Sequence, residues 1–149
     1  MRALQVQDHS EKPVFLDRSI PTLAANQILI RTAACALNFA DLLMIRGTYQ
    51  ETPALPFTLG MEVAGEIAGL GAEVTGFEIG DRVAGFAGSG GLAEYCPLEA
   101  TRCLKLTDGM SFDTAASALI SYGTSHLALT HRAKLTSADT LLVLGAGGG

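Results

Sequence analysis

The chain has 149 residues, of which 48% are hydrophobic and 17% are charged, and its net charge is -5 at pH 7. This composition argues against a disordered chain and provides enough apolar residues for one domain and part of a second. Since no basic cluster is present and no apolar run reaches membrane-spanning length, we expect neither nucleic acid nor a membrane as a partner. Residues 1–9 lack the apolar segment of a signal peptide, which predicts a cytoplasmic protein.

Short strands separated by glycine-rich turns are expected to dominate residues 1–110. Many of the 17 glycines stand beside short apolar runs, a pattern that favours β-structure with tight turns. The sequence predicts strands at residues 2–7, 27–36, 61–71, 82–86, 90–96 and 101–106. The segment between the first two contains Pro13 and Pro21 and is expected to be rich in turns. Strands of this length and spacing are typical of a barrel-like β domain.

One short helix is expected within this β region, at residues 39–46. Asn38 is a favourable N-cap residue, and Asp41 places a carboxylate in the first turn, where the helix dipole favours it. Gly47 suits the C-terminal end of the helix.

Two helical pieces are expected after residue 107. Ser111 is positioned to cap an alanine-rich helix over residues 111–119. A second helical piece follows over residues 121–133, and we expect a break at Gly123.

A strand and a glycine-rich loop end the sequence. Residues 141–144 predict a parallel strand that is buried on both faces. After a strand, glycines let the backbone turn sharply and approach a pyrophosphate, which makes the loop residues candidates for cofactor binding. These candidates are Gly145, Ala146, Gly147 and Gly148. Taken alone, the loop is also compatible with a terminal glycine tail. The sequence thus predicts one domain at residues 1–110 and the beginning of a second at residues 111–149.

The cysteines and histidines form no metal-binding pattern. The number of cysteines is odd and no Cys-x-x-Cys occurs, so we expect Cys35, Cys96 and Cys103 to be buried free thiols. The three histidines have no Cys or Glu partner at ligand spacing and are expected to be surface or packing residues.

Six segments carry a resemblance to a known family. They are N-F-A-D-L-L-M-I-R-G-T-Y at residues 38–49, P-F-T-L-G-M-E-V-A-G-E-I at 56–67, G-D-R-V-A-G at 80–85, G-G-L-A-E-Y at 90–95, S-Y-G-T-S at 121–125 and L-L-V-L-G-A-G-G-G at 141–149. In order and spacing they resemble the medium-chain dehydrogenase/reductase superfamily over the whole chain, and within it the zinc-free, zeta-crystallin type of quinone oxidoreductase. The resemblance implies a mostly β, GroES-like barrel domain (α+β), followed by the start of an α/β Rossmann domain that is cut off at its glycine loop.

The same resemblance implies that no zinc ion is bound. In the zinc-dependent branch, a Cys stands three residues before the motif Asp and a His directly before the motif Glu, and here these positions are Asn38 and Met61. Neither an amide nor a thioether is a good zinc ligand. The four-cysteine segment of a structural zinc site is also missing, since only A-G-S-G-G lies between Phe86 and Leu92. Glu62, beside Met61, is expected to make a structural hydrogen bond.

The chemistry implied by the resemblance is hydride transfer from NADPH to a quinone or to the β-carbon of an enone. Without a Lewis acid, hydrogen-bond donors must stabilise the charge that develops on the acceptor. Asn38 and Tyr49 are the candidate catalytic residues, because either side chain can donate to the acceptor oxygen. A helix cap explains Asn38 equally well, and packing alone explains Tyr49, so both interpretations stay open.

Further residues are assigned to the cofactor and the substrate by resemblance. The candidate cofactor-binding residues are Asn38, Asp41, Arg46 and Thr124. Met61 and Tyr49 are expected to line an apolar substrate pocket. Alternatives remain open for three of them: Asp41 favours the helix N-terminus, Arg46 pairs with a carboxylate, and Thr124 bonds to the backbone of its own helix.

The fold of this family needs more chain than these residues provide. The resemblance implies a homodimeric full-length parent, and residues 141–144 without a neighbouring strand would expose apolar side chains. We therefore expect the 149-residue chain itself to be inactive or nearly so. Two alternatives stay open: an enoyl-thioester or alkenal reductase of the same superfamily, and a non-catalytic GroES-like binding module.

Overall fold

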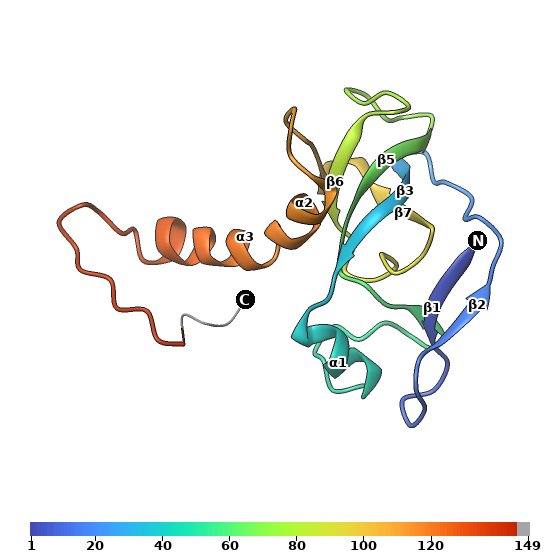
Figure 1. The fold of residues 1–149 in the computed structure, drawn as a ribbon, viewed down its shortest axis with the longest axis horizontal. Helices are drawn as coiled ribbons and strands as arrows, with labels where there is room; N and C mark the ends of the chain where they lie inside the picture. The colour runs from blue at the N-terminus through green and yellow to red at the C-terminus, as the bar shows by residue number, and fades with distance from the viewer. Residues whose placement is uncertain (146–149) are drawn as a thin grey trace.

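Two antiparallel sheets form most of the N-terminal part of the chain in the computed structural model, which describes residues 1–145 (Figure 1). The smaller sheet has the order β2-β1-β4, with β1 at Arg2–Val6, β2 at Val14–Asp17 and β4 at Phe57–Thr58. The larger sheet has the order β7-β3-β5-β6-β8, with β3 at Gln27–Ala36, β5 at Glu62–Leu70, β6 at Arg82–Phe86, β7 at Tyr95–Glu99 and β8 at Cys103–Lys105. We call residues 1–110, which contain both sheets, the sheet body.

The core of the sheet body lies on β3 and β5, strands of 10 and 9 residues that pair along most of their length. Ile30 stands opposite Ile67, and Cys35 stands opposite Val63. The β-branched side chains of Ile30, Ile67 and Val63 favour extended backbone and pack well on a pleated surface. The buried cluster on this pair consists of Ile28, Ile30, Val63, Ile67, Val83, Cys96, Leu98 and Cys103. The predicted, mostly β fold is confirmed.

Helix α1 (Phe39–Ile45) follows β3 and covers a second apolar cluster. Its Met44 side chain is 1% exposed. The cluster around Met44 consists of Val6, Phe57, Leu59 and Met61. The helix begins in a capping box of Asn38 and Asp41, and it ends before Gly47, whose φ of 66° few other residues adopt. The predicted helix and its end signals are confirmed.

Helix α2 (Phe112–Ala118) packs on the larger sheet through a seam of alanines. The seam consists of Ala64, Ala84, Ala115 and Ala116, each at most 2% exposed. Such small side chains let the helix and the sheet approach closely. Ser111 caps the helix as predicted, since its hydroxyl accepts the N–H of Thr114 at 3.2 Å.

The predicted helix break at Gly123 is wrong. Helix α3 spans Ser121–His126 and continues as a π-helical segment over Leu127–Arg132, so Gly123 lies inside α3. The interruption instead precedes α3, where the N–H of Ile120 donates to the Glu62 carboxylate at 2.9 Å. The acceptor at the interruption is thus a side chain of β5 and not a carbonyl of the helix.

Three strand predictions differ from the structure. The strand predicted at residues 101–106 is shorter, because a 3-10 helix, Ala100–Arg102, precedes β8. The segment after Pro13, which the sequence predicts as turns, contains the short strand β2, which pairs with β1. A strand is predicted at residues 90–96, whereas β7 begins only at Tyr95 and continues through Pro97 to Glu99. Because β7 is an edge strand, a proline without an N–H is tolerated there.

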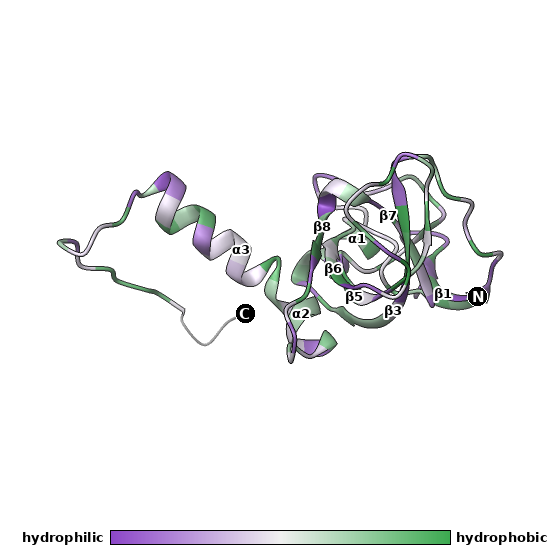
Figure 2. Ribbon diagram, turned by 90° about the horizontal axis from the view of Figure 1, so that it is seen from above, coloured by the Kyte–Doolittle hydropathy of each residue, from purple (hydrophilic) through white to green (hydrophobic). Residues whose placement is uncertain are grey.

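Residues 121–145, which we call the arm, project from the sheet body (Figure 1). The predicted strand at residues 141–144 is not formed, and Leu142 and Leu144 are 79% and 84% exposed. A strand needs a hydrogen-bonded neighbour, and no strand of the described chain pairs with this segment. Figure 2 shows hydrophobic stretches, in green, along the arm as well as within the sheet body. No helix among residues 1–145 combines the length and the hydropathy needed to cross a bilayer.

Candidate functional site

A cavity of about 520 Å³ lies where the sheet body meets the arm, and we call it the junction cavity. Its lining comes from four separate stretches of the chain, and the side chains that matter for its chemistry are Asn38, Tyr49, Met61, Ile120, Ser121 and Thr124. The fold thus brings together four residues that the sequence predicts for the site: Asn38, Tyr49, Met61 and Thr124.

Asn38 stands at the N-cap of α1 with an extended backbone, at φ -117° and ψ 154°. Its backbone N–H donates to Asp41 Oδ2 at 2.8 Å, and its side-chain Nδ2 donates to Glu62 Oε1 at 3.0 Å. An amide nitrogen carries two hydrogens, so a second one remains for a molecule in the junction cavity. The two interpretations of Asn38, a helix start and a donor, are therefore compatible.

Glu62 connects two walls of the junction cavity, and its partners could not be deduced from the sequence. The side chain is 1% exposed; Oε1 accepts from Asn38 Nδ2 at 3.0 Å and Oε2 from the backbone N–H of Ile120 at 2.9 Å. No ion pair among residues 1–145 includes this carboxylate. The expected structural hydrogen bond of Glu62 is confirmed. A signal for its importance is a charged residue directly after Met61 in an apolar strand, since a buried charge requires partners.

Asp41 is a second buried carboxylate near the site, with an exposed fraction of 4%. It accepts the N–H of Gly60 at 3.1 Å through Oδ1 and the N–H of Asn38 at 2.8 Å through Oδ2. It does not line the junction cavity. It lines a neighbouring, largely apolar cavity of about 530 Å³, which shares Leu37, Asn38 and Phe39 with the junction cavity. The contacts of Asp41 fit its role at the start of the helix.

Tyr49 and Met61 form an apolar part of the junction cavity. Met61 is buried and Tyr49 is half-buried, and both pack in the cluster around Met44. Tyr49 lies shortly after the glycine that ends α1, and its carbonyl accepts the Thr52 hydroxyl at 2.7 Å. Tyr49 therefore packs against the core and lines the junction cavity at the same time.

Thr124 is exposed on α3 and lines the junction cavity. Two other hydroxyls on the same helical stretch bond to its backbone. Ser125 donates to the carbonyl of Ser121 at 3.0 Å, and Thr130 donates to that of His126 at 2.6 Å. The Thr124 hydroxyl makes no such bond within the described residues. The alternative that Thr124 bonds to its own helix is therefore not realised.

Arg46 and Gly145, two further residues expected to bind the cofactor, do not line the junction cavity. Arg46 is exposed at the C-cap of α1 and does not line the junction cavity. Gly145, with a φ of 72°, lies at the far end of the arm. Ala146, Gly147 and Gly148 fall outside the described residues, so their expected contact with a pyrophosphate stays a prediction.

No three His, Cys, Asp or Glu side chains within residues 1–145 are arranged to hold a metal ion. The prediction of free thiols is confirmed: Cys96 and Cys103 are buried and Cys35 is half-buried. Burial raises the pKa of each thiol to about 12, and for Cys35 the negative charge of Asp41 adds to the effect. A thiol that stays protonated at neutral pH is a poor nucleophile, so these residues have structural roles. The prediction of a packing histidine holds for His9, whose Nδ1 lies 3.1 Å from a helix carbonyl.

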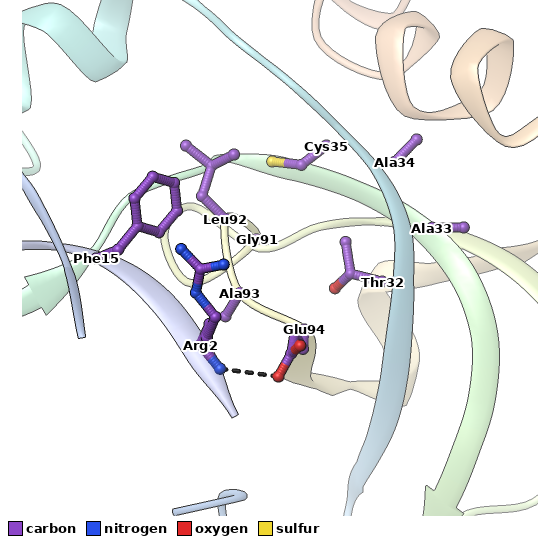
Figure 3. Close-up of a pocket in the computed structure, with 10 residues that line it drawn as sticks. All are labelled: Arg2, Phe15, Thr32, Ala33, Ala34, Cys35, Gly91, Leu92, Ala93 and Glu94. Carbon is purple, nitrogen blue, oxygen red and sulfur yellow. Dashed lines mark hydrogen bonds between the residues drawn. The ribbon is translucent and has the colours of Figure 1, made fainter. Parts of the chain in front are cut away.

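A separate hollow of about 390 Å³ lies between β1, β3 and residues 91–94 (Figure 3). There the guanidinium of Arg2 stacks on the ring of Phe15, 5.0 Å from its centroid. The backbone N–H of Arg2 donates to Glu94 at 2.8 Å, the dashed line in Figure 3. None of the predicted site residues within residues 1–145 lines this hollow, so the junction cavity is the candidate site.

The family of the chain follows from comparison with known proteins. Residues 24–108 match the alcohol dehydrogenase GroES-like domain. The chain belongs to this family and thus to the medium-chain dehydrogenase/reductase superfamily, as the sequence motifs predicted.

Curated relatives carry the name quinone oxidoreductase. Quinone oxidoreductase-like protein 2 homolog of Nematostella vectensis is 41% identical over 140 residues, which cover 92% of this chain and 38% of that protein. Human quinone oxidoreductase is 36% identical over 153 residues, which cover 100% of this chain and 46% of that protein. The chain therefore spans less than half the length of these relatives.

Two solved structures also resemble this chain over less than half of their own length. A mycobacterial protein in complex with NADPH superposes with a TM-score of 0.91 at 31% identity, covering 100% of this chain and 47% of that one. The quinone oxidoreductase of Thermus thermophilus, whose NADPH complex was also solved, superposes with a TM-score of 0.77 at 31% identity, covering 88% and 41%.

Proposed function

We propose that this chain supplies the substrate-binding part of an oxidoreductase that transfers a hydride from NADPH to a quinone or an enone without a metal ion. The observation that carries the proposal is the convergence of Asn38, Tyr49, Met61 and Thr124 on the junction cavity. The names of the curated relatives and the NADPH complexes of two similar structures support it.

The junction cavity suits a nicotinamide ring in size and chemistry. Its volume of about 520 Å³ falls within the range of about 300 to 1,000 Å³ that is typical of ligand pockets. Met61 and Ile120 offer apolar contact to the face of a ring, while the hydroxyls of Ser121 and Thr124 are suited to bind its carboxamide. Bound NADPH supplies the hydride, and these side chains orient the ring towards the acceptor.

The acceptor is held by donors on the opposite wall. The second amide hydrogen of Asn38 and the phenol of Tyr49 donate to the acceptor oxygen and stabilise the negative charge that develops on it. Because a hydrogen bond to Glu62 holds the side-chain amide of Asn38 in place, little reorganisation accompanies the reaction. The adjoining apolar cavity of about 530 Å³ is suited to the carbon skeleton of a quinone or an enone.

Titration of NADPH fluorescence tests this proposal, with the complete gene product and the 149-residue chain measured side by side. Turnover is then assayed with 1,4-benzoquinone, an alkenal and an enoyl thioester. We expect the complete gene product to bind NADPH and to reduce benzoquinone fastest. We expect the 149-residue chain to do neither, because residues 141–144 form no strand that could hold the glycine loop towards the cofactor.

Three results would contradict parts of the proposal. Failure of the complete gene product to bind a nicotinamide cofactor would favour a binding module without catalysis. Faster turnover of the enoyl thioester or the alkenal would reassign the acceptor. Full turnover by the 149-residue chain would show that it is active by itself.

A further inference from the structure

We propose that Glu62 is a positioning residue, which sets the direction in which Asn38 donates and at the same time holds the first residues of α3 against the sheet body. The proposal rests on the proposed function, in which Asn38 donates to the acceptor oxygen.

The two oxygens of Glu62 bind two different walls of the junction cavity. Oε1 accepts from Asn38 Nδ2 at 3.0 Å, across 24 residues of sequence, and Oε2 accepts from Ile120 N at 2.9 Å, across 58 residues. Asn38 and Ile120 both line the junction cavity, whereas Glu62 itself is 1% exposed behind it. One buried side chain therefore sets the relative position of the acceptor wall and of the helix that carries Thr124.

The carboxylate also determines which way the Asn38 amide faces. An ionised carboxylate has acceptors and no donor, so the atom of Asn38 that faces it is the NH₂ group and not the carbonyl oxygen. A solvent-exposed asparagine adopts either orientation freely. Here the contact with Glu62 selects one, and with it the direction of the second amide hydrogen.

Burial of this carboxylate is not explained by stability alone. No cation among residues 1–145 forms an ion pair with Glu62, and transferring a charge from water into a protein interior is unfavourable. An apolar side chain of similar size would avoid that penalty, but it would leave the Asn38 amide free to turn and the N–H of Ile120 without an acceptor.

The substitution Glu62→Gln separates the two contacts. Glutamine has one acceptor oxygen and one NH₂ group, whereas both partners of Glu62 are donors. The backbone N–H of Ile120 cannot reverse, so the glutamine oxygen is expected to face it. The glutamine NH₂ then faces Asn38, and the Asn38 amide must turn to present its carbonyl oxygen. The variant thus reverses the polarity of Asn38 and keeps the link to α3.

Nuclear magnetic resonance on the ¹⁵N-labelled 149-residue chain tests the orientation directly. Wild type, Glu62→Gln and the control Glu66→Gln are compared; Glu66 lies on the same strand, but its side chain is 40% exposed and pairs with Arg31. In wild type we expect slow hydrogen exchange at Asn38 Nδ2 and at Ile120 N. In Glu62→Gln we expect exchange at Asn38 Nδ2 to become at least tenfold faster, with its resonances shifted, while Ile120 stays protected. The control should match wild type.

Two outcomes of this experiment would overturn the proposal. One is an Asn38 side-chain amide that is unprotected in wild type, a measurement that does not depend on folding of any variant. The other is a Glu62→Gln variant whose Asn38 resonances and exchange equal those of the control.

Turnover by the complete gene product then separates this proposal from the proposed function. We expect Glu62→Gln to lower kcat by roughly 10- to 100-fold, with less than about twofold change in the KM for NADPH, because the lost interaction acts in the transition state. Glu66→Gln should leave both values unchanged. Absence of reductase activity in wild type would reject the proposed function and leave the orientation of Asn38 to the resonance data. Equal kcat values for the two variants would reject the positioning role.

Discussion

The sheet body and the arm contain the same kinds of apolar residue in opposite environments. Ile28 and Ile30 on β3 are 0% exposed, whereas Leu142 and Leu144 in the arm are 79% and 84% exposed. The strands of the body bury their side chains against one another, while the apolar residues of the arm have no counterpart within the described chain. The stability of this chain therefore comes from the sheet body and from α2, which packs on it.

The junction cavity lies where these two regions meet. Its Asn38 and Met61 belong to the body and are held by buried partners, whereas its Thr124 belongs to the arm and is exposed. One wall is thus built by the core, and the other depends on the contact between Glu62 and Ile120.

Truncation of one large apolar residue in each region should give the largest difference in the free energy of unfolding between the two regions. We expect Ile30→Ala to lower the free energy of unfolding by about 2 to 5 kcal/mol, because it leaves a cavity in a packed core. Leu142→Ala should change it by less than about 0.5 kcal/mol, because the side chain is already in water. Urea unfolding followed by circular dichroism measures both. Equal losses would mean that the arm is packed as firmly as the body.

Glycine-to-alanine substitutions should have opposite signs in the two regions. At Gly65 on β5, a Cβ would stand 2.1 Å from the carbonyl oxygen of Arg31, so we expect a loss of about 1 to 3 kcal/mol. At Gly123 in α3, a Cβ would meet nothing within 4 Å, and alanine is the better helix former by about 1 kcal/mol. Thermal unfolding gives the first value, and helix content by circular dichroism reports the second. A stabilised Gly65→Ala variant would contradict the close approach of β3 and β5.

The smallest effect concerns the buried thiols, all of which lie in the sheet body. Burial raises the pKa of Cys96 to about 12, whereas a free thiol ionises near about 8.5. As the pH rises above about 8, the unfolded chain loses this proton first, so the folded state loses relative stability. Between pH 7 and pH 9 we expect wild type to lose up to about 1 kcal/mol more than Cys96→Ala. Parallel pH profiles of unfolding for the two proteins would argue against a buried, protonated Cys96.

Elements that depend on local patterns could be predicted from the sequence, and those that depend on distant partners could not. Strand β3 at Gln27–Ala36 and helix α1 at Phe39–Ile45 agree with their apolar runs and end signals. The predicted break at Gly123 was wrong because the real interruption depends on Glu62, 58 residues from Ile120. Strand β7 was shifted because Pro97 disfavours a strand unless it lies at an edge, and the edge is known only once the sheet is formed.

The candidate site was also predictable from the sequence only in part. Motif resemblance pointed to Asn38, Tyr49, Met61 and Thr124, and the fold places all four at the junction cavity. Their roles stay predictions until they are measured. The link through Glu62 was beyond the sequence, because the partners of a buried carboxylate depend on how three segments pack.

The break before α3 also sets how far the site can be displaced. Two contacts hold α2 on the sheet body. At its start, the guanidinium of Arg82 lies 4.6 Å from the ring centroid of Phe112, and beyond its end the Ile120 N–H donates to Glu62. A rotation of the arm about Ile120 would therefore displace nearby residues little and distant residues much. Thr124 is only about 6 Å along the helix axis from this point, so a swing of about 10° moves it by about 1 Å. The same rotation would move Gly145, at the far end of the arm, much further than the residues that line the junction cavity.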